Sequence, residues 1–298
     1  MPLRLSALLC AFALSTALPA QAEETPPLPD YVIAQFGTPP AVPSGPLSDT
    51  LETAADMAFV ESMQQGTWGR DQSLALDEIA ASGDPRLAWI ISDLMRFVTS
   101  PQLNFVLSEA AATLLEIDTP TENTWGIVTD HLIAWDIPEP PDYLRFKRAI
   151  FTAIVPEWDP LFVPGDIDWR LVSWGGVLID DRAFDTTDDP CNCIPAADTP
   201  EVTDAASATW LKDDDIVFGV EVNGEYRAYP RQIMEVREMV NDTLGGRDLG
   251  IPYCTLCGAA QAYFTDQMPA GVDRPILRTS GLLSRSNKVM YDLTTYSV

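Results

Sequence analysis

The 298-residue sequence has few histidines and few basic residues, and each shortage excludes a class of function. The single histidine, His131, cannot supply the two histidines of an H-E-x-x-H zinc motif, and no histidine lies in the C-terminal third to complete a Ser-His-Asp triad there. We expect His131 to be a helix-surface or packing residue. Lys and Arg number 18 against 44 Asp and Glu, which gives a formal net charge of −26. Because Lys and Arg supply the affinity for nucleic acids and anionic membranes, we expect neither as a partner.

The sequence contains no Walker A motif and no dinucleotide-binding glycine fingerprint. Long apolar runs are also missing from most of the chain. Beyond the first 22 residues, no stretch approaches the roughly 20 apolar residues of a membrane-spanning helix, so we expect no stable membrane span in the mature chain. Residues 1–22 have the pattern of a secretory signal peptide: Arg4, the apolar run 5–18, and the cleavage site Ala20-Gln21-Ala22. We therefore expect a mature chain that begins at Glu23 and lies in an oxidising compartment, the bacterial periplasm.

The mature chain changes character along its length, and the pattern predicts an α+β fold. A proline-rich lead-in covers 23–49, a helical domain covers 50–155, a connector rich in Trp and Asp covers 156–190, and a mainly β domain covers 191–298. Asp84 before Pro85 is a strong helix-start signal, and helix starts recur roughly every 14 to 23 residues. This spacing is compatible with a HEAT-like array of paired helices or with a compact bundle.

The β domain contains one clear hairpin signal and one short helix. Asn223-Gly224 joins two β-rich runs and suits a type I′ turn. Pro230 is expected to open a helix whose apolar face is Ile233, Val236 and Val240, with Gly245-Gly246 at its end. Further strands are expected at 249–253, 259–264, 276–279 and 288–291.

Acidic residues are concentrated in the helical part of the chain. Residues 23–190 hold 8 basic and 29 acidic residues, a net charge of −21, whereas residues 191–298 hold 9 and 15, a net charge of −6. A solvated acidic surface that keeps an exported protein soluble is the favoured interpretation. The alternative is a docking surface for a cationic protein partner.

The four cysteines of the mature chain form two clusters, Cys191-x-Cys193 and Cys254-x-x-Cys257. Gly258 follows the second cluster, and a predicted strand precedes it, as in a metal knuckle. Three interpretations are open: a metal ion such as zinc held by two to four of these cysteines, one or two plain disulfides, or a thiol–disulfide exchange site. The fifth cysteine, Cys10, lies inside the predicted signal peptide.

Polar residues near the second cysteine cluster are further candidates. Glu238, Asn241 and Asp242 are expected to cluster near the end of the short helix, as general acid or base groups, as metal-supporting residues, or as a capped helix end. Arg285 and Asn287 lie in a polar turn between two predicted strands, where Arg285 could bind an anion.

The β domain resembles the domain-of-unknown-function 3179 family over residues 191–298. The resemblance rests on motifs in register: Ile194-Pro195-Ala196-Ala197-Asp198, Val240-Asn241-Asp242-Thr243, Tyr253-Cys254-Thr255-Leu256-Cys257-Gly258, and Ser286-Asn287-Lys288-Val289-Met290-Tyr291-Asp292. The resemblance implies an exported protein of bacteria or archaea and assigns no reaction. Two departures are notable. Arg237 stands before Glu238 where members commonly have histidine, and members continue past the Tyr-Asp strand, so a truncated copy of the domain is expected.

Three functions follow from these patterns. The first is a periplasmic module that binds a metal ion through Cys254 and Cys257, with Cys191 and Cys193 as further ligands. The second is a non-catalytic interaction protein that uses its helical domain, with disulfides stapling the β domain. The third is a thiol–disulfide oxidoreductase. The sequence leaves open whether the protein is an enzyme.

Overall fold

A computed structural model describes residues 27–186 and 191–298, and the chain divides into two units, residues 1–37 and 38–298. The predicted signal peptide lies outside the described residues. Within the first unit, α1 (Asp30–Phe36) begins after Pro29 and ends at Gly37, which has a φ of 78°. None of the helices in the described part of the chain is both long and apolar enough to cross a membrane.

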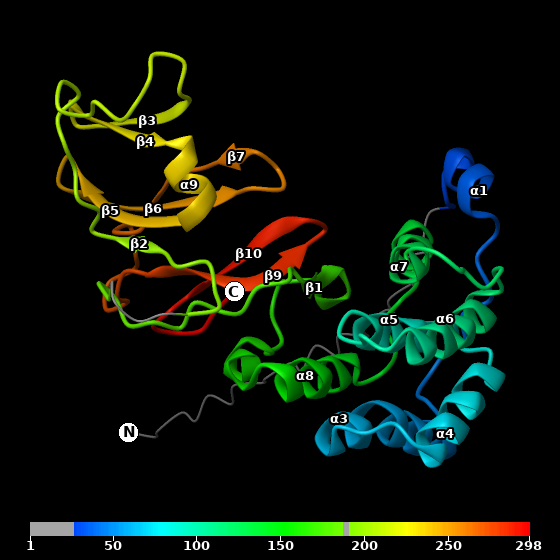
Figure 1. Cartoon of the computed structure of the whole chain (residues 1–298). Coiled ribbons are helices and arrows are strands. Elements are labelled where there is room, and N and C mark those ends of the chain that lie inside the picture. Colours follow the sequence, from blue (N-terminus) through cyan, green and yellow to red (C-terminus); the bar gives the residue numbers. More distant parts are fainter. Residues whose placement is uncertain (1–26, 187–190) are drawn as a thin grey trace, which may run out of the picture. The chain divides into compact units, whose positions relative to one another are not determined.

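The second unit begins with helices and continues with strands, which confirms the predicted α+β class (Figure 1). Most of its helices come before residue 172. They are α2 (Asp49–Ala55), the π-helical η1 (Asp56–Glu61), α3 (Ser62–Gln65), α4 (Arg70–Ala81), η2 (Pro85–Leu87), α5 (Ala88–Met95), α6 (Pro101–Leu115), α7 (Thr124–Ala134), α8 (Tyr143–Ile154), η3 (Pro156–Leu161) and η4 (Trp169–Leu171).

Helix α5 forms the centre of the helical core. Every residue of α5 is buried, and α6, α7 and α8 all pack against it. The predicted start signal is confirmed, because the Asp84 carboxylate accepts a hydrogen bond from Arg86 N at 3.1 Å and the chain then enters η2 and α5. The Trp89 indole donates to Ile137 O at 2.8 Å, so this large apolar side chain is buried with its polar atom paired. Whether these helices form a HEAT-like repeat stays a prediction.

A charged pair is buried in this helical core. The Lys147 ammonium of α8 contacts Asp93 Oδ1 of α5 at 2.5 Å, and Tyr143 donates to Asp93 Oδ2 at 2.7 Å. Burial raises the pKa of Asp93 and lowers the pKa of Lys147, while the attraction between their charges opposes both shifts. The pair therefore stabilises the core only while both partners are present.

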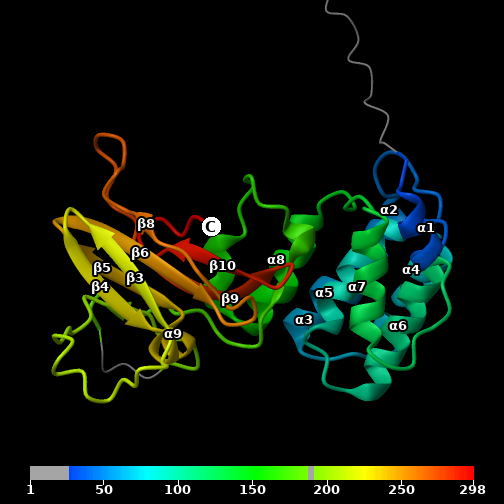
Figure 2. The ribbon, with the colours of Figure 1, turned by 90° about the horizontal axis from the view of Figure 1, so that it is seen from above.

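The Trp-rich connector joins the helices to the β part. Phe97 of the helical part stacks on Trp174 at a centroid distance of 5.3 Å and meets Phe151 edge-on at 4.9 Å. Trp158 of η3 is fully buried, and its indole donates to Ser280 O at 2.7 Å. Figures 1 and 2 both show α8, which precedes η3, beside strand β9 (Leu277–Ser284). These aromatic side chains attach the helices to β1 (Val172–Trp174) and β9.

The strands form three sheets in the described part of the unit. One has the order β1-β9-β10, one has the order β2-β5-β6-β7 with β8 also paired to β6, and β3-β4 is a hairpin. All strand pairs are antiparallel except β2 with β5. Besides β9, the strands are β1 (Val172–Trp174), β2 (Ala197–Asp198), β3 (Val217–Val222), β4 (Glu225–Pro230), β5 (Met239–Leu244), β6 (Arg247–Cys254), β7 (Ala259–Ala260), β8 (Tyr263–Phe264) and β10 (Asn287–Asp292).

The predicted hairpin is confirmed, but the predicted end of the short helix is wrong. Helix α9 (Arg231–Arg237) ends at Glu238, whose φ of 51° lies in the left-handed region, and the chain then continues as β5. Gly245-Gly246 forms the turn from β5 into β6 instead of ending the helix. A side chain at Gly245 would meet Val222 O at 2.2 Å, so glycine is required there. Val240 suited both a helical face and a buried strand, and pairing with β6 decided the outcome.

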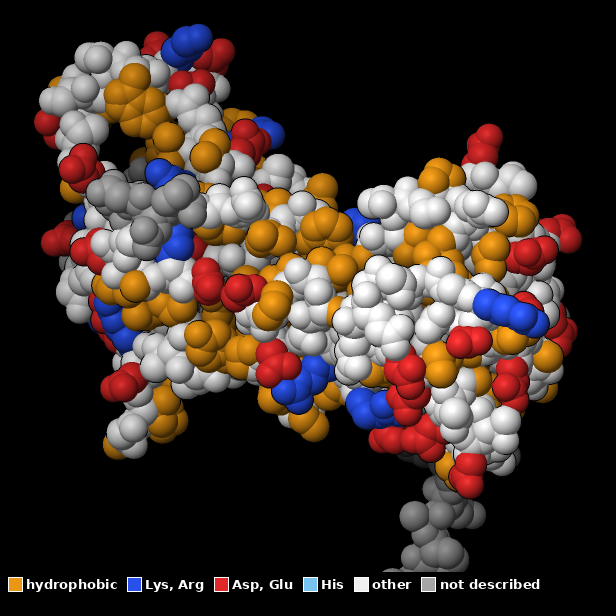
Figure 3. All heavy atoms as spheres, turned by 60° about the horizontal axis from the view of Figure 1, so that its bottom comes forward, with side chains coloured by type: hydrophobic (Ala, Val, Ile, Leu, Met, Phe, Trp, Pro, Cys, Tyr) orange, Lys and Arg blue, Asp and Glu red, His pale blue; other side chains and the backbone are white. Residues whose placement is uncertain are grey.

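Carboxylates are spread over the helical part of the unit on the face shown in Figure 3, with apolar side chains between them. Several carboxylates of the helical part are paired with arginines, as in Arg145–Asp56 at 2.5 Å and Arg148–Asp159 at 2.7 Å. These pairs are about half exposed, so water screens them and each contributes little to stability. Their exposure is consistent with the interpretation of a solvated acidic surface.

Candidate functional site

The C-x-x-C segment forms a tight turn between β6 and β7. Strand β6 ends at Cys254, Cys257 N donates to Cys254 O at 3.2 Å, and Gly258 then adopts a φ of 63°. The left-handed backbone at Gly258 lets the chain reverse into β7 within four residues. This turn places both thiols on the same side of the loop.

The two thiols are free and very close to one another. Cys254 is half-buried and Cys257 is exposed, and their sulfurs lie 2.7 Å apart. Both sulfurs also face the turn between β9 and β10, where Ser286 O lies 3.6 Å from Cys254 Sγ and 3.5 Å from Cys257 Sγ. Asn287 Oδ1 lies 3.2 Å from Cys257 Sγ. Of the two candidates in this turn, Asn287 therefore contacts the thiols.

Ionisation of the two thiols is coupled. The hydrogen bond between the sulfurs, above all, and the negative charge of a Cys254 thiolate raise the pKa of the Cys257 thiol above its ordinary value. The pair therefore releases its second proton only with difficulty.

A largely buried ion pair, Lys288–Glu238, lies beside the cysteine turn. Lys288 of β10 contacts Glu238 Oε2 at 2.6 Å and donates to Glu238 O at 2.9 Å. The Thr255 hydroxyl, between the two cysteines, donates to Glu238 Oε1 at 2.5 Å. Burial lowers the pKa of Lys288, while the hydrogen bond and charge of Glu238 and the charge of Cys254 raise it. Glu238 thus holds the cysteine turn and the lysine in one place.

These groups border a small pocket of about 240 Å³. Cys254, Glu238 and Lys288 form its polar wall, and Ile194 and Leu282 are among the apolar residues opposite. Cys257 lies outside this lining, so Cys254 is the thiol that a small molecule or side chain in the pocket would meet first.

The positive charge of Lys288 should matter for the reactivity of Cys254. In the Lys288→Met variant, we expect alkylation of Cys254 by iodoacetamide at pH 7.5 to slow by about three- to tenfold, because a neighbouring cation favours the reactive thiolate. Peptide mass spectrometry of timed samples measures the rate. The matched control is Lys212→Met, at an exposed lysine that does not line this pocket. Equal rates in the two variants would show that Lys288 has only a structural role.

The expected cluster of Glu238, Asn241 and Asp242 does not form. Because residues 239–244 are a strand, Asn241 and Asp242 point to opposite faces of β5. Asn241 donates to Asp198 Oδ1 at 2.8 Å, whereas Asp242 accepts from the Tyr229 hydroxyl at 2.7 Å and from Arg227. Glu238 alone of the three borders the cysteine pocket.

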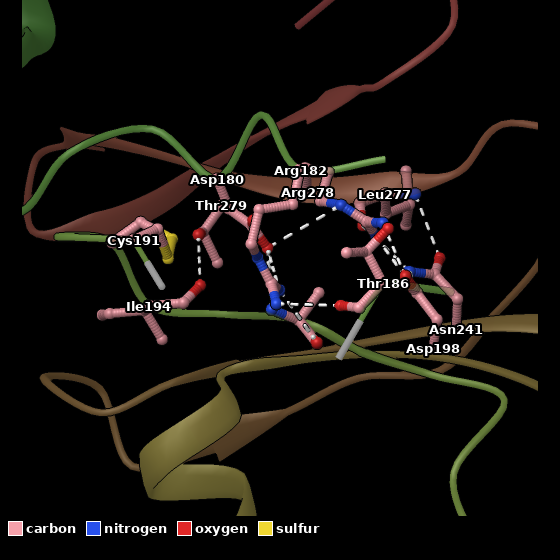
Figure 4. Close-up of polar contacts among 12 residues, drawn as sticks. Asp180, Arg182, Thr186, Cys191, Ile194, Asp198, Asn241, Leu277, Arg278 and Thr279 are labelled. Carbon is pink, nitrogen blue, oxygen red and sulfur yellow. Dashed lines mark hydrogen bonds and ion pairs between the residues drawn. A yellow bond between two sulfur atoms is a disulfide. The ribbon is translucent and has the colours of Figure 1, made fainter. Parts of the chain in front are cut away.

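The other cysteine pair lies in a different environment. Cys191 and Cys193 are joined by a disulfide next to the buried Asp180 carboxylate. Figure 4 shows this carboxylate within a polar network that ties the connector to β2, β5 and β9. Arg182 donates to Asp180 at 2.7 Å, and the fully buried Arg278 binds Asp198 at 2.6 and 2.8 Å. Among the described residues, no group of three close ligand atoms includes Cys254 or Cys257.

Several of these residues were not predicted from the sequence. Lys288 and Asp180 carry the charges beside the two cysteine pairs, and both are brought there by strand pairing rather than by sequence proximity. A weak signal for Lys288 exists, since this lysine directly precedes the apolar run Val289-Met290-Tyr291 of a predicted strand. Arg285 lies in the turn between β9 and β10, as predicted, and its backbone N–H donates to Leu171 O at 3.1 Å.

Comparison with known protein families now identifies the C-terminal segment. Residues 191–298 match the family described as "Protein of unknown function (DUF3179)". The match confirms the resemblance that the motifs indicated. The matched residues, which we call the DUF3179 segment, include both cysteine pairs, β5 and the β9–β10 hairpin. Neither a curated protein nor a solved structure matches the chain.

Proposed function

We propose that the DUF3179 segment carries a redox-active dithiol, Cys254 and Cys257, that exchanges disulfides with a substrate in the pocket beside Lys288. The observation that carries the proposal is the 2.7 Å distance between two free sulfurs. Two thiolates on one tetrahedral zinc ion stand about 3.8 Å apart, given Zn–S bonds of about 2.3 Å. The observed sulfur–sulfur separation of 2.7 Å is closer to the roughly 2.05 Å of a disulfide bond than to the separation of two sulfurs bound to one zinc ion.

The exchange reaction uses each cysteine once. The Cys254 thiolate attacks one sulfur of a substrate disulfide, and the other substrate sulfur leaves as a thiolate, which takes up a proton. Cys257 then loses its proton and attacks Cys254 Sγ, which releases the second substrate thiol and forms the Cys254–Cys257 disulfide. The dithiol loses two electrons and the substrate disulfide gains them.

The proposal includes export, because a secretory signal at residues 1–22 would deliver the chain to a compartment in which disulfides form. Protein recovered from a periplasmic extract should have the mass of a chain that begins at Glu23. A chain retaining residues 1–22 in that fraction would contradict cleavage at this site.

The redox test uses the full mature chain and glutathione as the probe. We expect the free thiols, Cys254 and Cys257, to become one intramolecular disulfide as the ratio of oxidised to reduced glutathione increases. Dithiothreitol should restore both thiols. Alkylation followed by mass spectrometry counts the thiols at each ratio. Stable glutathione adducts on both cysteines, with no Cys254–Cys257 bond at any ratio, would refute the proposal.

A second candidate function is metal binding by the same two thiols, and the turn between β9 and β10 is what favours it. Ser286 O lies within 3.6 Å of both sulfurs, and Asn287 Oδ1 lies 3.2 Å from Cys257 Sγ, so two oxygen atoms lie close to the dithiol. Zinc or another thiophilic ion would be held by Cys254 and Cys257. If so, the purified chain should contain metal that is lost in the Cys254→Ser/Cys257→Ser double variant. Unchanged metal content in that variant would exclude this candidate.

A further inference from the structure

The second cysteine pair lies beside a carboxylate in a way that suits a cation. One oxygen of Asp180 and the sulfurs of Cys191 and Cys193 all lie within 4.8 Å of one another. Leu178 pairs with Cys193, and its N–H donates to Asn192 O at 3.1 Å, so the connector that carries Asp180 runs alongside the two cysteines. Figure 4 shows Asp180 and Cys191 on these two stretches of chain.

The disulfide contributes little to holding this region together. It closes a loop with a single residue between its cysteines, so it removes little entropy from the unfolded chain. Other contacts already fix the segment: Ala196 N donates to Asp180 Oδ2 at 2.8 Å, and the Thr279 hydroxyl donates to Ile194 O at 2.9 Å. The bond between Cys191 and Cys193 can therefore be reduced without loss of the surrounding network.

If both sulfurs were thiolates, the groups around Asp180 would carry a net negative charge that a cation could neutralise. Among the residues that the structure describes, two carboxylates, Asp180 and Asp198, pair with two guanidinium groups, Arg182 and Arg278. Two thiolates would add two negative charges to this buried network, and a divalent cation would cancel them. Cys191 and Cys193 are half-buried next to the buried Asp180 carboxylate, where such an imbalance is costly, so reduction of the disulfide should favour uptake of a cation.

The Asp180 carboxylate has capacity for a further ligand. Asp180 Oδ1 accepts one hydrogen bond, from Arg182 Nε, within the described part of the chain, which leaves a lone pair for a ligand bond.

We propose that Asp180, Cys191 and Cys193 form a redox-gated site for Zn²⁺ or a similar thiophilic divalent cation. A dithiol reductant gives two electrons and two protons to the Cys191–Cys193 disulfide and becomes a disulfide itself. The two thiols then release two protons as their sulfurs bind the cation, Asp180 supplies the third ligand, and water completes the coordination. This inference concerns other cysteines than the proposed dithiol and does not depend on it.

The test uses the full mature chain with Cys254 and Cys257 replaced by serine, so that only the Cys191–Cys193 pair can respond. The chain is titrated with Zn²⁺ before and after reduction by a phosphine, and native mass spectrometry counts bound zinc. We expect none before reduction and one ion per chain after it. Equal zinc content in the two states would overturn the proposal.

Two variants assign the ligands. Adding Cys193→Ser should abolish zinc binding after reduction, and adding Asp180→Asn should weaken it at least tenfold, with Asp181→Asn, at an exposed neighbour, as the matched control. If Asp180→Asn does not fold, the Cys193→Ser result decides, because that change leaves the Asp180 network in place. Retention of one zinc ion in the Cys193→Ser chain would overturn the proposal as well.

Discussion

Replacing Cys254 by serine should abolish disulfide exchange, whereas replacing Cys257 should stop the reaction halfway. Cys254 borders the pocket and lies near the charge of Lys288, and its thiolate raises the pKa of Cys257. Under the proposed exchange reaction, we therefore expect Cys254 to be the attacking group. The Cys257→Ser chain retains the nucleophile but lacks the thiol that resolves the intermediate, so it should accumulate a one-to-one mixed disulfide with glutathione.

The two serine variants are compared by incubation with oxidised glutathione, acid quenching and intact mass measurement. We expect the Cys257→Ser chain to gain one glutathione and the Cys254→Ser chain to react at least about tenfold more slowly. Similar rates of adduct formation in both variants would contradict the assigned order of attack.

The coupling between the thiols adds a pH dependence with a definite sign. In the Cys254→Ser chain, no thiolate neighbours Cys257, so the pKa of Cys257 should fall toward its ordinary value. Because only the thiolate is alkylated, the midpoint of the Cys257 pH–rate profile should move to lower pH than in the unaltered chain. An unmoved midpoint would show that the two thiols ionise independently.

Local signals in the sequence predicted the elements that depend on neighbouring residues. Asp84-Pro85 marked the start of η2 and α5, and Asn223-Gly224 marked the turn between β3 and β4, because capping and left-handed turns are decided within about four residues. The C-x-x-C-G turn belongs to the same class. The β-rich run at 249–253 predicted a strand before this turn, and β6 ends there.

Contacts between distant residues could not be predicted in this way. Lys288 reaches Glu238 across 50 residues, and the β9–β10 turn that meets the thiols is about 30 residues from them. The error at residues 239–244 has the same origin, since Val240 suits a helix face by its spacing and a buried strand by its type. Pairing with β6 decided between them, and no local pattern encodes that pairing.

The largest stability effect is expected in the helical core, from the Asp93→Ala variant. Removal of this carboxylate leaves the ammonium of Lys147, which has no exposed surface, without its counter-charge, and leaves the Tyr143 hydroxyl without its acceptor. An uncompensated buried charge costs about 3–5 kcal/mol, so the free energy of unfolding should fall by that amount. Urea denaturation followed by tryptophan fluorescence measures the change.

Two comparisons separate the charge effect from simple truncation. Asp159→Ala removes an ion pair of similar length, Arg148–Asp159 at 2.7 Å, but both partners are about half exposed, and the loss should stay below about 1 kcal/mol. The double variant Asp93→Leu/Lys147→Met removes both buried charges and should be more stable than Asp93→Ala, because an apolar pair needs no compensation. If Asp93→Ala cost no more than Asp159→Ala, Lys147 would have to lose its proton or reach water, and the buried pair would not be what holds α5 against α8.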